Sequence, residues 1–233
     1  MRKISVEELC KMLEERNPGE MLELKDCEFQ NMDLCGWNLS DIDFSLSSFF
    51  DVRLDGCNFQ RCKFENALLD GNSLAGADFR NASLKGCCMR SCDMTDCDLR
   101  GADLFSSVLE KAKKDGWKTD DETKWYKLRC PEEGAFVGYK KCIGDRIVQL
   151  LIPADAKRTS ATLPTCRCSK AKVLCIKNFE ETKEFEEAWS MVDENFVYRK
   201  GQWVEVLDFN EDRWMDSTTG IHFWMSRREA MGY

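Results

Sequence analysis

Apolar residues recur at every fifth position through the first half of the chain, from Leu24 to Leu104. The seventeen positions are Leu24, Phe29, Leu34, Leu39, Phe44, Phe49, Leu54, Phe59, Phe64, Leu69, Leu74, Phe79, Leu84, Met89, Met94, Leu99 and Leu104. A period of five drifts by about 140° per repeat on an α-helix and alternates faces on a flat strand. The chain must therefore turn once in every repeat, which predicts a solenoid.

The residues just before each apolar centre support this turn. Two residues before the centre the side chain is usually small, as in Cys27, Ser47, Cys57, Cys62, Ala67, Ala77, Ala82, Cys87, Cys92, Cys97 and Ala102. An extended segment places positions i−2 and i on one side, so both should point inward. One residue before the centre Asp or Asn is common, and short polar side chains that bond local amides are what tight turns require.

Segments such as Ala77-Asp78-Phe79-Arg80-Asn81 and Ala102-Asp103-Leu104 resemble the A(D/N)LXX unit of the pentapeptide-repeat family. The resemblance covers about residues 22–109. It implies a mainly β fold, a right-handed quadrilateral β-helix with four repeats per coil and about four coils. Read at twenty-residue offsets, the series predicts three aromatic stacks, which are Phe29 with Phe49, Phe44 with Phe64, and Phe59 with Phe79.

The chain divides into four predicted parts. Residues 1–19 form an N-terminal capping helix, in which Ser5 and Glu8 make a capping box. Residues 20–109 form the solenoid and residues 110–129 a linker or cap, with a cap helix over 107–114. Residues 130–233 form a small α+β domain. Its expected strands are residues 135–142, 146–152, 171–177, 202–206 and 221–225, with a helix over 182–189 and a last helical turn after the capping-box pattern of 226–229.

Charge and cysteine usage set the broad class. The net charge of −8 belongs to residues 20–109, which carry sixteen acidic and eight basic residues. No apolar run is long enough to span a membrane, and the first residues lack the apolar stretch of a signal peptide. Six of the fourteen cysteines fall at the small inward position. We therefore expect reduced, packed thiols, a cytoplasmic location and no membrane contact.

Candidate chemistry lies in a basic segment of the C-terminal domain. No acidic residue lies between Asp155 and Glu180, where cations alternate with hydroxyls. Such a segment suits phosphate binding. The candidate anion ligands are Arg158, Ser160, Thr162, Arg167, Lys170, Lys172, Arg213 and His222. The alternative is that these cations pair with Asp208, Glu211, Asp212 and Asp216 or with the acidic solenoid.

His222 is the sole histidine, and it suits a general base, an anion contact or a satisfied core residue on a strand. Together with Cys166, Cys168 and Cys175, it would supply four possible zinc ligands. Their spacing matches no common zinc module, so no metal or cofactor is predicted. Nothing marks a nucleophile, so no catalytic residue is assigned.

Four blocks of the C-terminal half resemble an uncharacterised domain that follows pentapeptide repeats in phage and prophage proteins. The blocks are Ser160-Ala161-Thr162, residues 166–174, Asp212-Arg213-Trp214 and Gly220-Ile221-His222-Phe223. This resemblance covers about residues 130–233 and implies no established activity. It suggests that the blocks form one surface.

The favoured function is a non-enzymatic binding or scaffold protein, whose solenoid and C-terminal recognition domain face a macromolecular partner. The resemblance implies one specific version, because some pentapeptide-repeat proteins resemble duplex DNA and bind type II topoisomerases. Four coils are short for that role. The alternative is a C-terminal domain that binds or modifies a nucleotide or other phosphate-bearing ligand, interfering with host defence. Nucleic acid is not an expected partner, because the acidic solenoid would repel phosphate.

Overall fold

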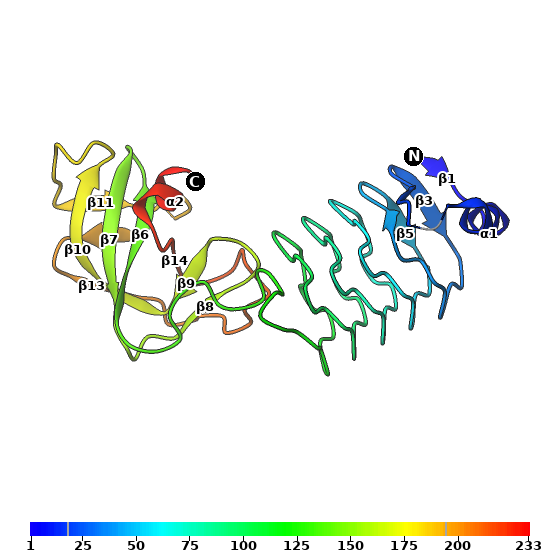
Figure 1. The fold of residues 1–233 in the computed structure, drawn as a ribbon. Helices are drawn as coiled ribbons and strands as arrows, with labels where there is room; N and C mark the ends of the chain where they lie inside the picture. The colour runs from blue at the N-terminus through cyan, green and yellow to red at the C-terminus, as the bar shows by residue number, and fades with distance from the viewer. Residues whose placement is uncertain (18, 194) are drawn as a thin grey trace. The chain divides into compact units, whose positions relative to one another are not determined.

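The computed structural model describes residues 1–17, 19–193 and 195–233. The chain is mainly β and forms two compact units, Met1–Tyr126 and Lys127–Tyr233 (Figure 1). The boundary falls inside the predicted linker of residues 110–129. Each unit is described by itself below.

A helix and a strand cover the start of the first unit. The predicted capping helix spans Val6–Glu15 (α1), and Ser5 accepts a hydrogen bond from the Glu8 amide at its N-cap. Leu9 is its fully buried residue. Ahead of it, β1 (Arg2–Lys3) pairs in parallel with β3 (Cys27–Gln30), a pairing that the sequence did not indicate. The edge of the first coil is thereby paired rather than exposed.

The rest of the first unit repeats every twenty residues. The strands β2 (Leu22–Glu23) and β4 (Ile42–Asp43) pair in parallel, as do β3 and β5 (Ser48–Phe50). Parallel bridges between residues twenty apart then continue from Asp33↔Arg53 to Asp98↔Lys118. Figure 1 shows these segments as successive coils.

The predicted apolar centres form the interior of this unit. All seventeen are buried, and the three aromatic stacks are confirmed. The ring centres of Phe29 and Phe49 lie 4.7 Å apart, and those of the other two stacked pairs 5.1 Å apart. The Asp and Asn residues that precede the apolar centres close the turns as expected. Each of these side chains, from Asp33 to Asp103, accepts a hydrogen bond from the backbone amide two residues further on.

The prediction that the repeat ends at Leu104 with a helix over 107–114 was wrong. Val108 and Lys113 pair with Cys88 and Asp93 as further rungs, and the last rung joins Asp103 to Lys124. Lys114 takes the inward position of a centre, where its ammonium donates to the carbonyls of Leu109 and Ala112. A coil already formed offers its free backbone groups to the next one, so pairing continues where the apolar pattern has stopped.

The second unit is built on two antiparallel sheets. The larger has the order β13 (Trp203–Glu205), β10 (Lys170–Asn178), β7 (Arg146–Ile152) and β6 (Phe136–Cys142). The smaller has the order β14 (Ile221–Phe223), β9 (Cys166–Cys168) and β8 (Arg158–Ser160). A bridge between Tyr139 and Trp224 connects them, and α2 (Arg227–Met231) follows with the predicted capping box of Ser226 and Glu229.

The helix predicted over residues 182–189 was wrong. Glu184 forms an antiparallel β-bridge with Lys177, and β11 (Glu187–Trp189) pairs with β12 (Val197–Arg199). This pairing buries Ala188 opposite Tyr198, and tertiary burial of that kind overrides local helix propensity. In the described part of this unit helical structure is limited to α2, so the unit is more strongly β than the predicted α+β domain.

Candidate functional site

The bridged residues of the solenoid form four outward columns, and three of them carry charge. Side chains in these three columns alternate between acids, bases and small polar groups. The columns are Asp33, Arg53, Ser73, Asp93 and Lys113; Asn38, Asn58, Asp78, Asp98 and Lys118; and Asp43, Lys63, Ser83, Asp103 and Lys124. Neighbouring rungs pair within a column, as Arg53 does with Asp33 and Lys113 with Asp93, both at 2.7 Å.

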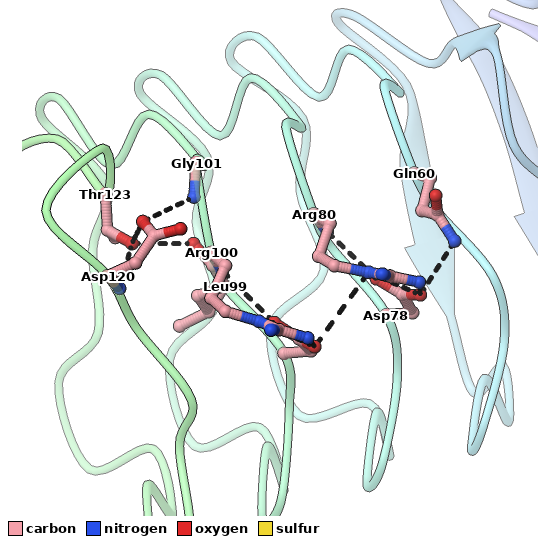
Figure 2. Close-up of polar contacts among 9 residues, drawn as sticks. Gln60, Asp78, Arg80, Leu99, Arg100, Gly101, Asp120 and Thr123 are labelled. Atoms are coloured by element: carbon pink, nitrogen blue, oxygen red, sulfur yellow. Dashed lines mark hydrogen bonds and ion pairs between the residues drawn. The ribbon is translucent and has the colours of Figure 1, made fainter.

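Figure 2 shows how the second column satisfies its own charges. Arg80 lies against Asp78 at 2.7 Å and reaches Asp98 at 3.9 Å, while Arg100 lies 2.6 Å from Asp98. The Arg100 hydrogen bond lowers the pKa of Asp98 from its ordinary value. Gln60 donates to Asp78 from the preceding rung. These carboxylates have partners on the solenoid itself.

The fourth column begins with Glu28 and is uncharged from Ser48 to Val108. We call Leu46, Ser48, Phe50, Leu68, Cys88 and Val108 the apolar face; the positions that correspond to Phe50 on the later rungs are the charged Asp70, Arg90 and Glu110. The members of the column after Ser48 are Leu68, Cys88 and Val108, and Leu68 is 45% exposed. On the Ser48 rung, Leu46 and Phe50 flank the column and are 55% and 46% exposed. Leu46 also has a φ of +63°, a left-handed conformation that is unfavourable for a leucine. The equivalent turn residues of other repeats have the same conformation, among them Asp41, Asp51 and Arg61, but these are polar.

The structure directs the two central arginines of the basic segment toward the protein itself. Arg158 donates to the carbonyls of Pro153, Ala154 and Gly134, among others. Arg167 is 2% exposed, and burial lowers its pKa. Guanidinium donors that already have carbonyl partners stabilise loops.

The other predicted ligands are spread over the unit. Ser160 accepts from the Arg129 amide, and its own carbonyl accepts from Arg213 at 3.0 Å. Lys170 pairs with Asp155 at 2.6 Å, and Lys157 of the same basic segment pairs with Glu211. The remaining two are Thr162, which is buried, and Lys172, which is half-buried on β10. The Lys157–Glu211 pair is one that the alternative interpretation had named.

His222 and Arg167 are brought together, because they face each other in the β14–β9 register. The imidazole Nε2 lies 3.1 Å from the Asp216 carbonyl, to which it donates as Nε2–H. Burial lowers the pKa of His222, and the cationic Lys140 and Arg167 lower it further. The histidine lies on one wall of a cavity of about 1230 Å³, whose wall also contains Lys140 and Tyr198.

Sequence reasoning missed Lys140. It lies beside Lys141 in the sequence, and a pair of lysines suggests exposure. The strand alternation was the usable signal, since Gly138, Lys140 and Cys142 share the buried face of β6.

The inward cysteines of the solenoid have a role beyond filling space. Cys57, Cys62, Cys92 and Cys97 each donate a thiol hydrogen bond to the carbonyl of an apolar centre 23 residues earlier. Burial raises the pKa of all four to about 12, so they remain protonated donors. All fourteen cysteines are free.

Among residues 1–17, 19–193 and 195–233, no three His, Cys, Asp or Glu side chains are grouped to hold a metal ion. In the same part of the chain, no helix has the length and apolar character needed to cross a bilayer.

Two family descriptions match the chain. Residues 22–99 match the pentapeptide repeat region, and residues 126–230 match a family of unknown function, DUF5758. The predicted repeat is thereby confirmed over residues 22–99. The phage setting of the C-terminal half stays a prediction. No curated protein matches the chain.

Three similar solved structures cover parts of the chain. HetL, a pentapeptide repeat protein involved in heterocyst differentiation regulation from the cyanobacterium Nostoc sp. strain PCC 7120, is 25% identical over 49% of this chain and 46% of its own (TM-score 0.38). A pentapeptide repeat protein from the Arabidopsis thaliana thylakoid lumen is 25% identical over 37% and 61% (TM-score 0.36). QnrB1, a plasmid-mediated fluoroquinolone resistance protein, is 22% identical over 50% and 65% (TM-score 0.31). The chain spans about half to two thirds of each.

Proposed function

We propose that this protein is a non-enzymatic binding protein that presents the apolar face of a rigid solenoid to a protein partner. The observation that carries the proposal is the contrast between one uncharged column, Ser48 to Val108, and three charged ones. In this proposal the solenoid is a right-handed quadrilateral β-helix, and the twenty-residue spacing of its bridges supports four repeats per coil. The C-terminal unit adds a second recognition surface.

Contact with a partner would account for the exposure of these side chains. Contiguous apolar surface on a protein marks an interaction site, and burying it contributes about 25 cal/mol per Å². The solenoid also meets the partner with little loss of entropy, because parallel backbone pairing fixes each rung.

The charged columns argue against a DNA-like role for the solenoid. A DNA mimic needs a run of free acidic groups, as the phosphates of a duplex are free. Here Arg53, Arg61 and Arg80 pair with carboxylates of their own or adjacent rungs. A partner that recognises apolar surface fits this arrangement better than one that recognises nucleic acid.

The test compares two substitutions that add the same charge to different columns. Leu68→Glu places a carboxylate on the apolar face, and Ser73→Glu places one on a charged column. Both positions point outward from a bridged rung. Ser73→Glu also loses the hydrogen bond from Ser73 to Asp55, so the thermal midpoint of each variant is measured first and binding is compared between folded proteins. The tagged proteins are compared by quantitative mass spectrometry of what each retains from cells that naturally contain the protein.

We expect Ser73→Glu to retain the same partner as the wild type and Leu68→Glu to bind it at least about tenfold more weakly. Titration of the identified partner against each variant gives the dissociation constants. Equal retention by the two variants would overturn the proposal and place the binding surface elsewhere.

A further inference from the structure

The C-terminal unit has a cavity of about 1230 Å³ that the proposed function does not use. Its wall is formed by β6, β12 and β14 together with residues 163–165, 190–193, 205–208 and 216–220. Much of this wall is apolar, including Leu163, Phe196, Leu207 and Trp224. A cavity of this size and lining suits a small organic molecule.

Lys140 brings a positive charge into this wall without a matching acid. The residue is 7% exposed, and its ammonium donates to the His222 carbonyl at 3.3 Å. It also lies 5.9 Å from the centre of the Tyr198 ring. Among the described residues no carboxylate forms an ion pair with it, and burial lowers its pKa from the ordinary value. A buried ammonium is costly unless a counter-charge pairs with it.

Tyr198 supplies a second donor on the same wall. The residue is 2% exposed, yet its hydroxyl makes no hydrogen bond with any of the described residues. Burial raises the pKa of the hydroxyl well above its ordinary value, so it stays protonated and can donate. None of the described residues has a buried side-chain nitrogen or oxygen without a hydrogen-bond partner, so this hydroxyl is open to the cavity that Tyr198 lines.

His222 holds this arrangement in place from the opposite strand. Its ring donates a hydrogen bond to the Asp216 carbonyl, and its own backbone carbonyl accepts a hydrogen bond from the Lys140 ammonium. Burial disfavours the charged form of the imidazole. Lys141 and the hydroxyls of Thr165, Ser190 and Thr218 also line the cavity, and Lys140 is the buried one of its two lysines.

We propose that this cavity binds a small organic acid with an apolar body, whose carboxylate accepts hydrogen bonds from Lys140 Nζ and Tyr198 Oη. A carboxylate would give the buried Lys140 ammonium a counter-charge that none of the described residues supplies, and a charge-assisted hydrogen bond to carboxylate is strong. The apolar body packs against Leu163, Phe196 and Trp224. Five acidic residues also line the cavity, which are Asp193, Glu205, Asp208, Asp216 and Glu229. They repel any anion, and a phosphate with up to two charges more strongly than a monocarboxylate.

Calorimetric titration with paired probes tests the proposal on the full chain. The probes are octanoate, benzoate and 2-naphthoate, each compared with its uncharged primary amide. We expect the wild type to bind at least one acid about tenfold more tightly than its amide, the effect of one charged hydrogen bond. Lys140→Met should remove that preference while leaving amide binding within about twofold.

Two further variants keep the result interpretable. Lys172→Met removes a half-buried lysine of β10 that does not line the cavity, and it should bind the probes as the wild type does. Tyr198→Phe removes only the hydroxyl and should weaken acid binding about fivefold, which decides the matter should Lys140→Met fail to fold. Acids and amides that bind the wild type equally, or an acid preference that survives in both cavity variants, would overturn the proposal.

Discussion

The interior carbonyls of the two units receive their hydrogen bonds from very different sources. In the solenoid, a small inward side chain donates to the carbonyl 23 residues earlier, and the same contact recurs coil after coil. Ser47 makes it at 2.8 Å and Cys57 at 2.9 Å. In the C-terminal unit, the Arg167 guanidinium donates hydrogen bonds to three carbonyls that are distant in sequence, those of Asn210, Asp212 and Thr219, each at 2.9 Å.

This difference teaches where each unit is vulnerable. A repeated contact is distributed, so the loss of one copy leaves the neighbouring rungs intact. A contact concentrated in one residue has no substitute, because the loop from Asp208 to Thr219 has little regular structure of its own. We therefore expect core packing to decide stability in the solenoid and single polar residues to decide it in the C-terminal unit.

The largest effect should follow Phe64→Ala in the solenoid core. The Phe64 ring is fully buried and lies within 5.1 to 6.1 Å of the rings of Phe44, Phe59, Phe79 and Phe49. Removing it should cost about 3–5 kcal/mol of unfolding free energy. Hydrogen exchange should show lost protection on the neighbouring coils and unchanged protection in Lys127–Tyr233. Equal loss of protection in both units would contradict the comparison.

Arg167→Met should have the next largest effect, because it removes a buried guanidinium that donates to three carbonyls of one loop, of which the Asp212 carbonyl keeps only the bond from the Met215 amide. We expect a cost of about 3 kcal/mol, read from chemical denaturation of the C-terminal unit. Protection from hydrogen exchange should fall first around Asn210 to Thr219.

Arg61→Met is the matched control for that loss. Arg61 is paired with Asp41 at 2.6 Å on the solenoid surface, where half of its side chain is exposed. A surface ion pair of this kind contributes less than about 1 kcal/mol. If the two arginine variants proved equally stable, the carbonyl contacts of Arg167 would not be what holds its loop.

The same contrast explains how far the sequence predicts each unit. Every apolar centre from Leu24 to Leu104 was identified from its spacing, because one geometric rule governs all the rungs. The far end was missed because Lys114 and Trp117 replace the usual inward residues while the backbone pairing continues. Pairing between backbones leaves no trace in side-chain type.

The C-terminal unit has no such rule. Arg167 looked like an anion ligand, because its basic neighbours are visible in the sequence and its carbonyl partners, 43 to 52 residues away, are not. Lys140 was hidden for the opposite reason, since its burial depends on the strand face it shares with Gly138 and Cys142. Side chains that act through tertiary contacts can be found only once the strands are placed.

The smallest effect, and the finest test of the repeated contact, is a pair of substitutions at Cys97. Its thiol donates to the Leu74 carbonyl at 3.1 Å, and Ser47 makes the equivalent bond elsewhere in the solenoid. Cys97→Ala removes the donor and should cost about 1 kcal/mol, whereas Cys97→Ser keeps it and should cost less. The measurement is urea denaturation followed by circular dichroism. If the serine variant were the less stable of the two, the sulfur would matter for its volume and apolar character, and the inward cysteines would serve only to fill the coil.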